Sequence, residues 1–79
     1  MLKLSIISPD ETLFEGEVEA VFLPGTKGAF EILPDHAPII SSLTSGNVRY
    51  RQNGEETSVA ISSGFMKCLK NTVSVCIEK

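Results

Sequence analysis

The stretch that decides the fold is residues 48–61, VRYRQNGEETSVAI, in which the dipeptide Asn53-Gly54 separates two runs of alternating apolar and polar residues. Successive side chains of a β-strand point to opposite faces, so each run has one core face and one solvated face. Asn and Gly both tolerate the positive φ that a two-residue type I′ turn requires. The sequence therefore predicts a β-hairpin that joins a strand near Val48–Arg51 to one near Thr57–Ile61.

The same alternation with period two extends over most of the chain. It occurs in Leu2–Ile6, in Glu17–Phe22 (where Val18, Ala20 and Phe22 alternate with Glu17 and Glu19) and in Val73–Ile77. Asn71 predicts a second tight hairpin, which joins Phe65–Leu69 to Val73–Ile77. No segment has a helical period, and turn residues recur every eight to twelve positions. This pattern predicts an all-β, antiparallel sandwich or barrel. The predicted core includes Leu4, Ile6, Val59, Val73 and Val75.

Length and composition exclude several classes of protein. The 79 residues form one domain, spanning 1–79, and the formal net charge is −3. Lys and Arg are scattered, so the chain lacks the basic stripe of a nucleic-acid-binding protein. No run approaches the roughly 20 apolar residues of a membrane span, and the N-terminus does not resemble a signal peptide. We therefore expect the protein to stay where it is made, with reduced cysteines.

Five acidic residues fall within ten positions without a basic residue between them: Asp10, Glu11, Glu15, Glu17 and Glu19. One interpretation is a solvated loop and strand face. The other is an acidic patch that meets a basic partner, because complementary charge guides protein association.

The residue types needed for catalysis or metal binding are sparse. His36 is the one histidine, and it lies in a proline-rich turn beside Asp35, with Ser41 and Ser42 shortly after. We interpret it as a histidine fixed by turn hydrogen bonds or used in a protein contact, and the alternative is an active-site base. The segment Gly25–Gly28 lacks the spacing of a phosphate-binding loop. We expect no enzyme activity, no cofactor and no metal.

Seven residues separate Cys68 from Cys76, so the two cysteines do not form the Cys-x-x-Cys motif of many metal sites. If residues 70–72 form a hairpin turn, the two cysteines could face each other across the strands. We expect free thiols that behave as small hydrophobic side chains, and a disulfide or a metal site remains the alternative.

A set of ordered motifs goes further than these patterns. It comprises Leu13–Val18 (LFEGEV), Leu23–Gly28 (LPGTKG), Leu33–Ile40 (LPDHAPII), Ser42–Gly46 (SLTSG), Ser62–Phe65 (SSGF) and Asn71–Val75 (NTVSV). In order and spacing the set resembles the N-terminal domain of the epsilon subunit of F-type ATP synthases. The resemblance covers nearly the whole chain, and the His-Ala-Pro turn stands at its centre.

The resemblance implies a flattened sandwich of about ten short strands and a place in the central stalk of the rotary motor. There the subunit docks on the gamma subunit and on the ring of c subunits. It couples proton-driven rotation to ATP synthesis while nucleotide chemistry takes place on other chains. The implied location is peripheral, on the cytoplasmic face of a bacterial plasma membrane, where the subunit is attached only through the complex.

The resemblance also nominates contact residues. In the family, the turn matching Thr26–Phe30 and the His-Ala-Pro turn lie at the end that faces the c ring. The corresponding residues here are Lys27, Gly28, Ala29, Glu31, Asp35 and His36. Many relatives have an acidic residue where Ala29 stands and Gly where Asp35 stands. Charge contacts to the ring would then involve Glu31 or Asp35.

Typical relatives continue into a C-terminal helical hairpin that inhibits ATP hydrolysis, whereas this sequence ends at Lys79. We expect a short form without that inhibition and without an ATP site. The alternative function is a β-sandwich adaptor that recognises a peptide by adding a strand to a sheet edge.

Overall fold

The computed structural model describes every residue from Met1 to Lys79 and contains nine strands and no helix. The strands are β1 (Leu2–Ile7), β2 (Thr12–Val18), β3 (Ala20–Gly25), β4 (Gly28–Ile32), β5 (Ile39–Leu43), β6 (Gly46–Gln52), β7 (Glu55–Ile61), β8 (Ser63–Leu69) and β9 (Thr72–Glu78). The all-β sandwich prediction is confirmed, with nine strands where about ten were expected.

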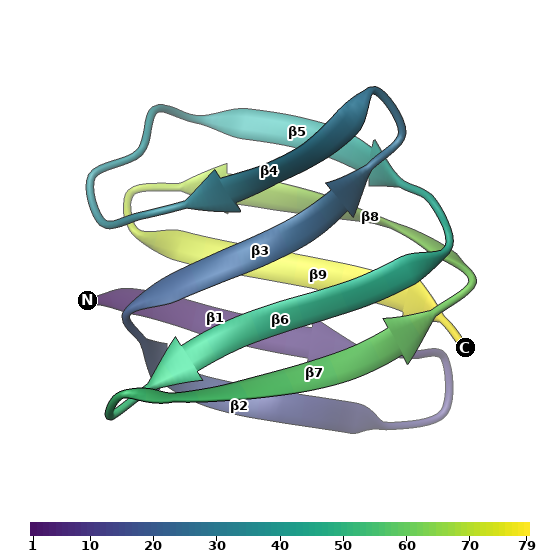
Figure 1. Cartoon of the computed structure of the whole chain (residues 1–79), viewed down its shortest axis with the longest axis horizontal. Coiled ribbons are helices and arrows are strands. Elements are labelled where there is room, and N and C mark those ends of the chain that lie inside the picture. The colour runs from purple at the N-terminus through teal and green to yellow at the C-terminus, as the bar shows by residue number, and fades with distance from the viewer.

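The strands form two packed layers (Figure 1). The back layer has the order β2-β1-β9-β8-β5, and the front layer consists of β4, β3, β6 and β7. A single residue pair, Gly25 with Leu43, joins β3 to β5 and thus one layer to the other. All neighbours are antiparallel except β1 and β9, which run parallel. Because β1 and β9 come from opposite ends of the sequence, the parallel pair brings the two halves of the chain together.

Both predicted hairpins are present, and their turn residues adopt the expected backbone. Asn53 and Gly54 have φ values of 53° and 79°, and Lys70 and Asn71 have φ values of 49° and 62°. Two successive positive φ values define the type I′ turn, whose twist matches that of the paired strands. The strands of each hairpin pair in unbroken register from the turn to their far ends.

The core lies between the layers and is built from the inward-facing residue of each alternating pair. Leu4, Ile6, Val73 and Val75 are fully buried, as predicted. Val59 is only partly buried, so its assignment to the core was wrong. It lies on β7, the last strand of the front layer, and no further strand covers its outer side.

The alternation predicted through Val18–Phe22 breaks at Glu19. Val18, Ala20 and Val21 are all buried, and Phe22 is half-buried on the outer face of the front layer. Glu19 lies where the chain passes from β2 in the back layer to β3 in the front layer, and its N–H donates to the Arg51 carbonyl at 2.8 Å. The change of layer reverses the inward and outward positions, which a continuous period cannot predict. Phe22 instead stacks against the guanidinium groups of Arg49 and Arg51.

Candidate functional site: an apolar face and the β4 strip

Apolar side chains gather on the outer face of the back layer. Phe65 on β8 pairs with Cys76 on β9, which pairs with Ile7 on β1, so the three side chains lie in one row across the sheet. Ile40 and Leu69 lie on the same face, on β5 and β8. The exposed fractions are 75% for Ile40, 58% for Phe65, 42% for Leu69 and 40% for Ile7. We call these four residues and Cys76 the apolar face.

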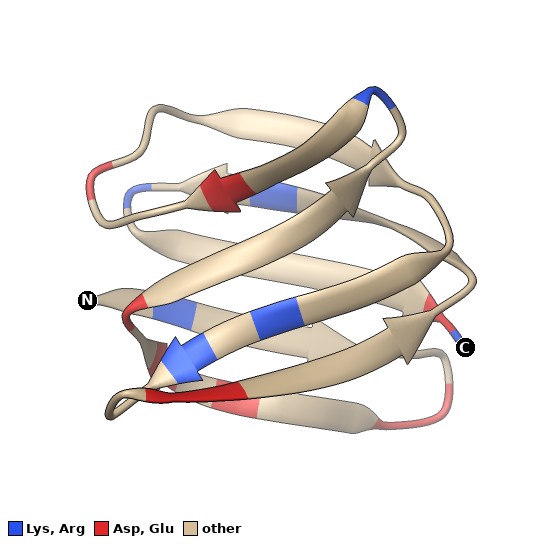
Figure 2. Ribbon diagram, in the orientation of Figure 1, with Lys and Arg blue, Asp and Glu red and all other residues tan.

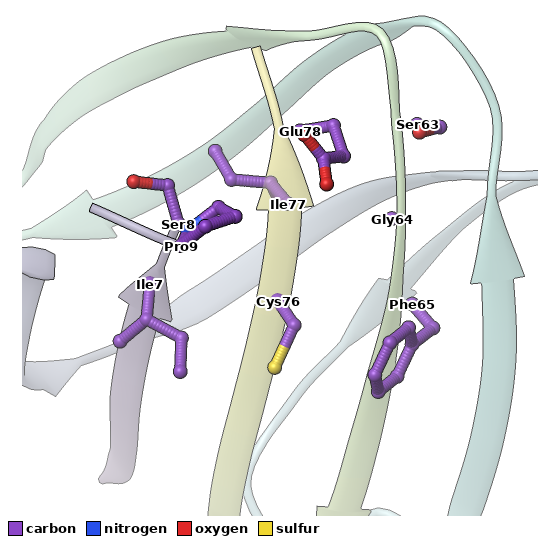
Figure 3. Close-up of a pocket in the computed structure, with 9 residues that line it drawn as sticks. All are labelled: Ile7, Ser8, Pro9, Ser63, Gly64, Phe65, Cys76, Ile77 and Glu78. Atoms are coloured by element: carbon purple, nitrogen blue, oxygen red, sulfur yellow. The ribbon is translucent and has the colours of Figure 1, made fainter. Parts of the chain in front are cut away.

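A groove of about 470 Å³ lies at one end of this face (Figure 3). Phe65 stands on one side of the groove and Ile7 with Pro9 on the other, with Cys76 between them, while Gly64 lies beside Phe65 on β8. A Cβ atom built on Gly64 would lie 2.4 Å from the Cys76 carbonyl oxygen. Glycine therefore lets β8 and β9 approach closely at the groove. A contiguous apolar patch of this kind marks an interaction surface on a folded protein.

Two lysines lie among these apolar residues. Lys67 lies on β8 between Phe65 and Leu69 and pairs with Ile40 on β5, so it interrupts the apolar face. Lys3 lies on the same face of β1, opposite Thr72 of β9. Both lysines are exposed, and neither forms an ion pair. In a protein interface, apolar side chains of this kind supply affinity and charged groups set orientation.

The two cysteines lie on opposite faces of the back layer, so the expectation that they could face each other was wrong. Cys68 pairs with Val73 and is buried in the core, whereas Cys76 pairs with Phe65 on the apolar face. Burial raises the pKa of the Cys68 thiol. Side chains on opposite faces of a sheet cannot bridge without backbone movement, and both cysteines are free.

The six residues nominated for a ring contact lie along β4 and its two ends. Lys27 precedes β4 in its turn with β3, Gly28 begins the strand with a φ of 131°, and the side chains of Ala29 and Glu31 are exposed. Asp35 and His36 lie in the loop after β4, at the opposite end of the strand (Figure 1). A five-residue strand separates the two groups by roughly 16 Å. The six residues therefore do not form one cluster but are spread along β4 and both of its ends, and we call them the β4 strip.

Hydrogen bonds hold the loop of the β4 strip in place. The Asp35 N–H donates to Asn71 Oδ1 at 2.6 Å, and Asn71 Nδ2 donates to Asp35 Oδ1 at 3.2 Å. Asp35 has a φ of 68°, which glycine adopts without strain and Asp tolerates better than most residues.

His36 is fixed by its own turn, as interpreted from the sequence. Its N–H donates to the Leu33 carbonyl at 3.2 Å, and its Nδ1 lies 2.7 Å from the Ala37 carbonyl oxygen and donates to it. The nearby serine hydroxyls bond elsewhere: Ser41 Oγ donates to the Ser42 carbonyl, and Ser42 Oγ shares a hydrogen bond with Thr26 Oγ1. Asp35, His36 and the serines therefore do not form a catalytic triad.

Other charged groups are dispersed. Figure 2 shows acidic and basic residues interspersed over the sandwich, without a continuous basic stripe. Asp10 and Glu11 precede β2, Glu15 and Glu17 lie within it, and Glu19 follows it, so the acidic cluster of the sequence extends along the whole strand. No three His, Cys, Asp or Glu side chains lie close enough to hold a metal ion. The structure has no helix capable of crossing a lipid bilayer.

Sequence reasoning missed the apolar face because it followed only the core half of each alternating strand. The signal was present in Phe65–Leu69, where Phe65 and Leu69 occupy outward positions and Met66 and Cys68 occupy inward ones. Large apolar residues at outward positions, here on either side of Lys67, indicate a surface that is apolar outside the core.

Comparisons with known proteins agree with this architecture. The profile of the ATP synthase delta/epsilon chain beta-sandwich domain matches residues 1–79. The ATP synthase epsilon chain of Leptospira borgpetersenii serovar Hardjo-bovis (strain JB197) is 38% identical over 77 residues, covering 98% of this chain and 61% of the relative. That of Desulfitobacterium hafniense (strain DSM 10664 / DCB-2) is 42% identical over 75 residues, covering 95% of this chain and 57% of the relative. This chain thus spans about three-fifths of the length of these relatives.

Solved structures share the fold. A chain in the cryo-EM structure of the Euglena gracilis mitochondrial ATP synthase (OSCP/F1/c-ring) superposes with a TM-score of 0.92 at 21% identity, over 99% of this chain and 51% of that one. A chain in the central stalk/c-ring structure of the Tetrahymena thermophila mitochondrial ATP synthase superposes with a TM-score of 0.81 at 12% identity, over 99% and 63%. These structures show the same fold, and the match of the family profile to residues 1–79 shows that the chain belongs to the ATP synthase delta/epsilon family and corresponds to its β-sandwich domain.

Proposed function

We propose that this chain is a non-catalytic central-stalk subunit of a proton-translocating F-type ATP synthase. It docks on the gamma subunit and on the c ring, and it couples proton-driven rotation to ATP synthesis. Family membership supports the proposal, as do the bacterial relatives named ATP synthase epsilon chain. The subunit is peripheral, on the cytoplasmic face of a bacterial plasma membrane, and is attached through the complex.

The apolar face carries the proposal. Phe65, Ile40, Leu69 and Ile7 expose large apolar side chains on one face of one sheet, and burying such surface stabilises a complex by about 25 cal/mol per Å² before the costs of association. A stalk subunit that must rotate as a unit with gamma needs a contact of this kind. We assign the apolar face to gamma, with the Phe65–Ile7 groove at one end of the contact.

The β4 strip suits the second contact. Lys27, Glu31 and Asp35 present charges of both signs along one border of the sandwich, on a different side from the apolar face. A surface of small and charged residues fits the polar loops that join the transmembrane segments of a ring subunit. Glu31 on the rigid strand and Asp35 in the fixed loop are the charged residues that would orient the ring.

Calorimetry with the gamma subunit from the same genome tests the proposal. We expect a one-to-one complex with a Kd below about 1 μM. Phe65→Ser should weaken binding at least about tenfold, because a few large side chains, aromatic ones among them, carry most of the binding energy of an interface. Leu33→Ser is the matched control: Leu33 is also large, apolar and half-exposed, but it lies in the loop after β4. No binding at tens of micromolar with both proteins folded would overturn the proposal.

The ring contact has its own test. Glu31→Lys should leave gamma binding unchanged and reduce the amount of this subunit and gamma retained on purified c rings. If the c rings retain equal amounts of the variant and the wild type, Glu31 takes no part in the ring contact.

A further inference from the structure

Strand β7 is a long, regular sheet edge with few of the features that prevent pairing. It runs for seven residues in unbroken register with β6 and contains neither Pro nor Lys, and its two charged residues, Glu55 and Glu56, both lie at its start. The other edges differ: β4 has only five residues, and β2 has an irregularity in its pairing with β1 at Ile6/Ile7. Natural proteins protect edges by shortness, charge, proline or bulges, and a long edge that is uncharged and regular beyond its first two residues is a template for another strand.

The hydrogen-bonding groups available at this edge follow from the hairpin. A two-residue turn makes the residues beside it, Gln52 and Glu55, a hydrogen-bonded pair, and such pairs alternate with non-bonded ones along an antiparallel ladder. Glu56, Ser58 and Ala60 occupy the non-bonded positions. Their N–H and C=O groups therefore point away from β6, toward the free edge.

The inner face of the front layer is also incomplete at β7. Val59 pairs with Val48 and Thr57 pairs with Tyr50, so both side chains lie on the core side of the sheet. Val48 and Tyr50 are buried, yet Val59 is half-buried and Thr57 is exposed. The core surface thus continues to the edge strand and lacks a neighbour there.

We infer that β7 binds an extended segment of a neighbouring subunit by strand addition. The segment carries an apolar residue that completes the burial of Val59 and a basic residue beside Glu55. Glu55 is exposed and has no ion pair, whereas Glu56 already pairs with Arg49 at 3.1 Å. Two copies of β7 related by a two-fold axis at Ser58 would place Glu55 opposite Ile61 and leave the acid unpaired. Charge complementarity therefore favours a basic segment of another protein over a second copy.

This inference rests on the proposed function, because the complex supplies the segment. Its first test is amide hydrogen exchange on the full-length protein, free and in the ATP synthase purified from its source organism. We expect the outward amides of Ser58 and Ala60 to exchange at least about tenfold more slowly in the complex. The ladder amides of Thr57 and Val59 should be slow in both states. If the protein is present in the complex and the outward amides keep their free rates, strand addition is wrong and the proposed function stands. If the protein is absent from the complex, the proposed function fails first.

A variant provides the second test. Ser58→Pro removes an outward N–H and leaves the ladder to β6 intact, since proline is tolerated at such edge positions. We measure binding of the isolated protein to ATP synthase from which this subunit has been removed. The Ser58→Pro variant should bind about tenfold more weakly than the wild type, and Ser58→Thr should bind as the wild type does. Thermal unfolding by circular dichroism checks that both variants fold. The inference would be overturned if the folded Ser58→Pro variant bound the complex as tightly as the wild type does. It would also be overturned if sedimentation showed that the wild type is a dimer and that the Ser58→Pro variant is a monomer. If the proline variant does not fold, the exchange experiment decides alone.

Discussion

Asp35 and Asn71, 36 residues apart, form a reciprocal pair of hydrogen bonds that joins the loop after β4 to the turn between β8 and β9. Both residues have positive φ, a backbone conformation that few residue types other than glycine adopt. The hydrogen bonds between them hold each residue in this conformation. The pair holds one end of the β4 strip against the back layer.

Asn71→Gly tests the strength of this link. Glycine keeps the turn conformation and removes both hydrogen bonds, so we expect the free energy of unfolding to fall by about 1 kcal/mol in urea titrations followed by circular dichroism. Asn53→Gly is the matched control, because it makes the same change in the other hairpin turn, where the Asn53 side chain forms no hydrogen bond while the Gly54 N–H donates to Glu19 in either variant. Equal losses in the two variants would show that the link contributes nothing.

Gly64→Ala should destabilise the sandwich at the groove. The added methyl would lie 2.4 Å from a backbone oxygen of β9, so the strands must separate, and we expect a loss of about 1–3 kcal/mol. Gly16→Ala is the control, since its nearest neighbour is the Phe14 ring at 3.1 Å, a side chain that can shift. Unfolding midpoints of the two variants give the comparison. A Gly64→Ala protein as stable as the Gly16→Ala protein would contradict the close approach seen here.

Leu4→Ala and Val59→Ala should lower the free energy of unfolding by different amounts, although both residues are apolar members of alternating apolar and polar runs. Leu4 is fully buried in β1, an interior strand between β2 and β9, so truncation leaves a cavity and should cost about 2–5 kcal/mol. Val59 loses fewer methyl groups from a half-buried edge, and about 1 kcal/mol is expected. The measurement is urea unfolding of the isolated protein. Similar losses at the two sites would mean that β7 is covered in the isolated protein.

The buried Cys68 thiol should make the free energy of unfolding decrease at alkaline pH. Burial raises the pKa of its thiol, so the folded state keeps a proton that the unfolded state releases. The unfolded state then binds fewer protons, and the free energy of unfolding decreases as the pH rises through the ordinary thiol pKa. Between about pH 8 and pH 10, the free energy of unfolding of Cys68→Ser should fall less steeply with pH than that of the wild type. Identical slopes in the two proteins would show that Cys68 is not the cause.

The sequence by itself determined the local structure. Alternation with period two identified the strands and most of the core, and Asn53-Gly54 and Asn71 located both hairpin turns, because these features depend on neighbouring residues alone. The ordered motifs indicated the family, which the comparisons confirmed. The nominated ring contacts remain a prediction.

Only the tertiary structure decided which face each strand presents and what lies beside it. The change of layer at Glu19 moved Phe22 out of the core, the edge position of β7 left Val59 half-buried, and register placed Cys68 and Cys76 on opposite faces. The apolar face exists because pairing of β1, β9, β8 and β5 brings Ile7, Phe65 and Ile40 from distant segments onto one surface. Strand order is set by long-range pairing, which the alternation of a single strand does not encode.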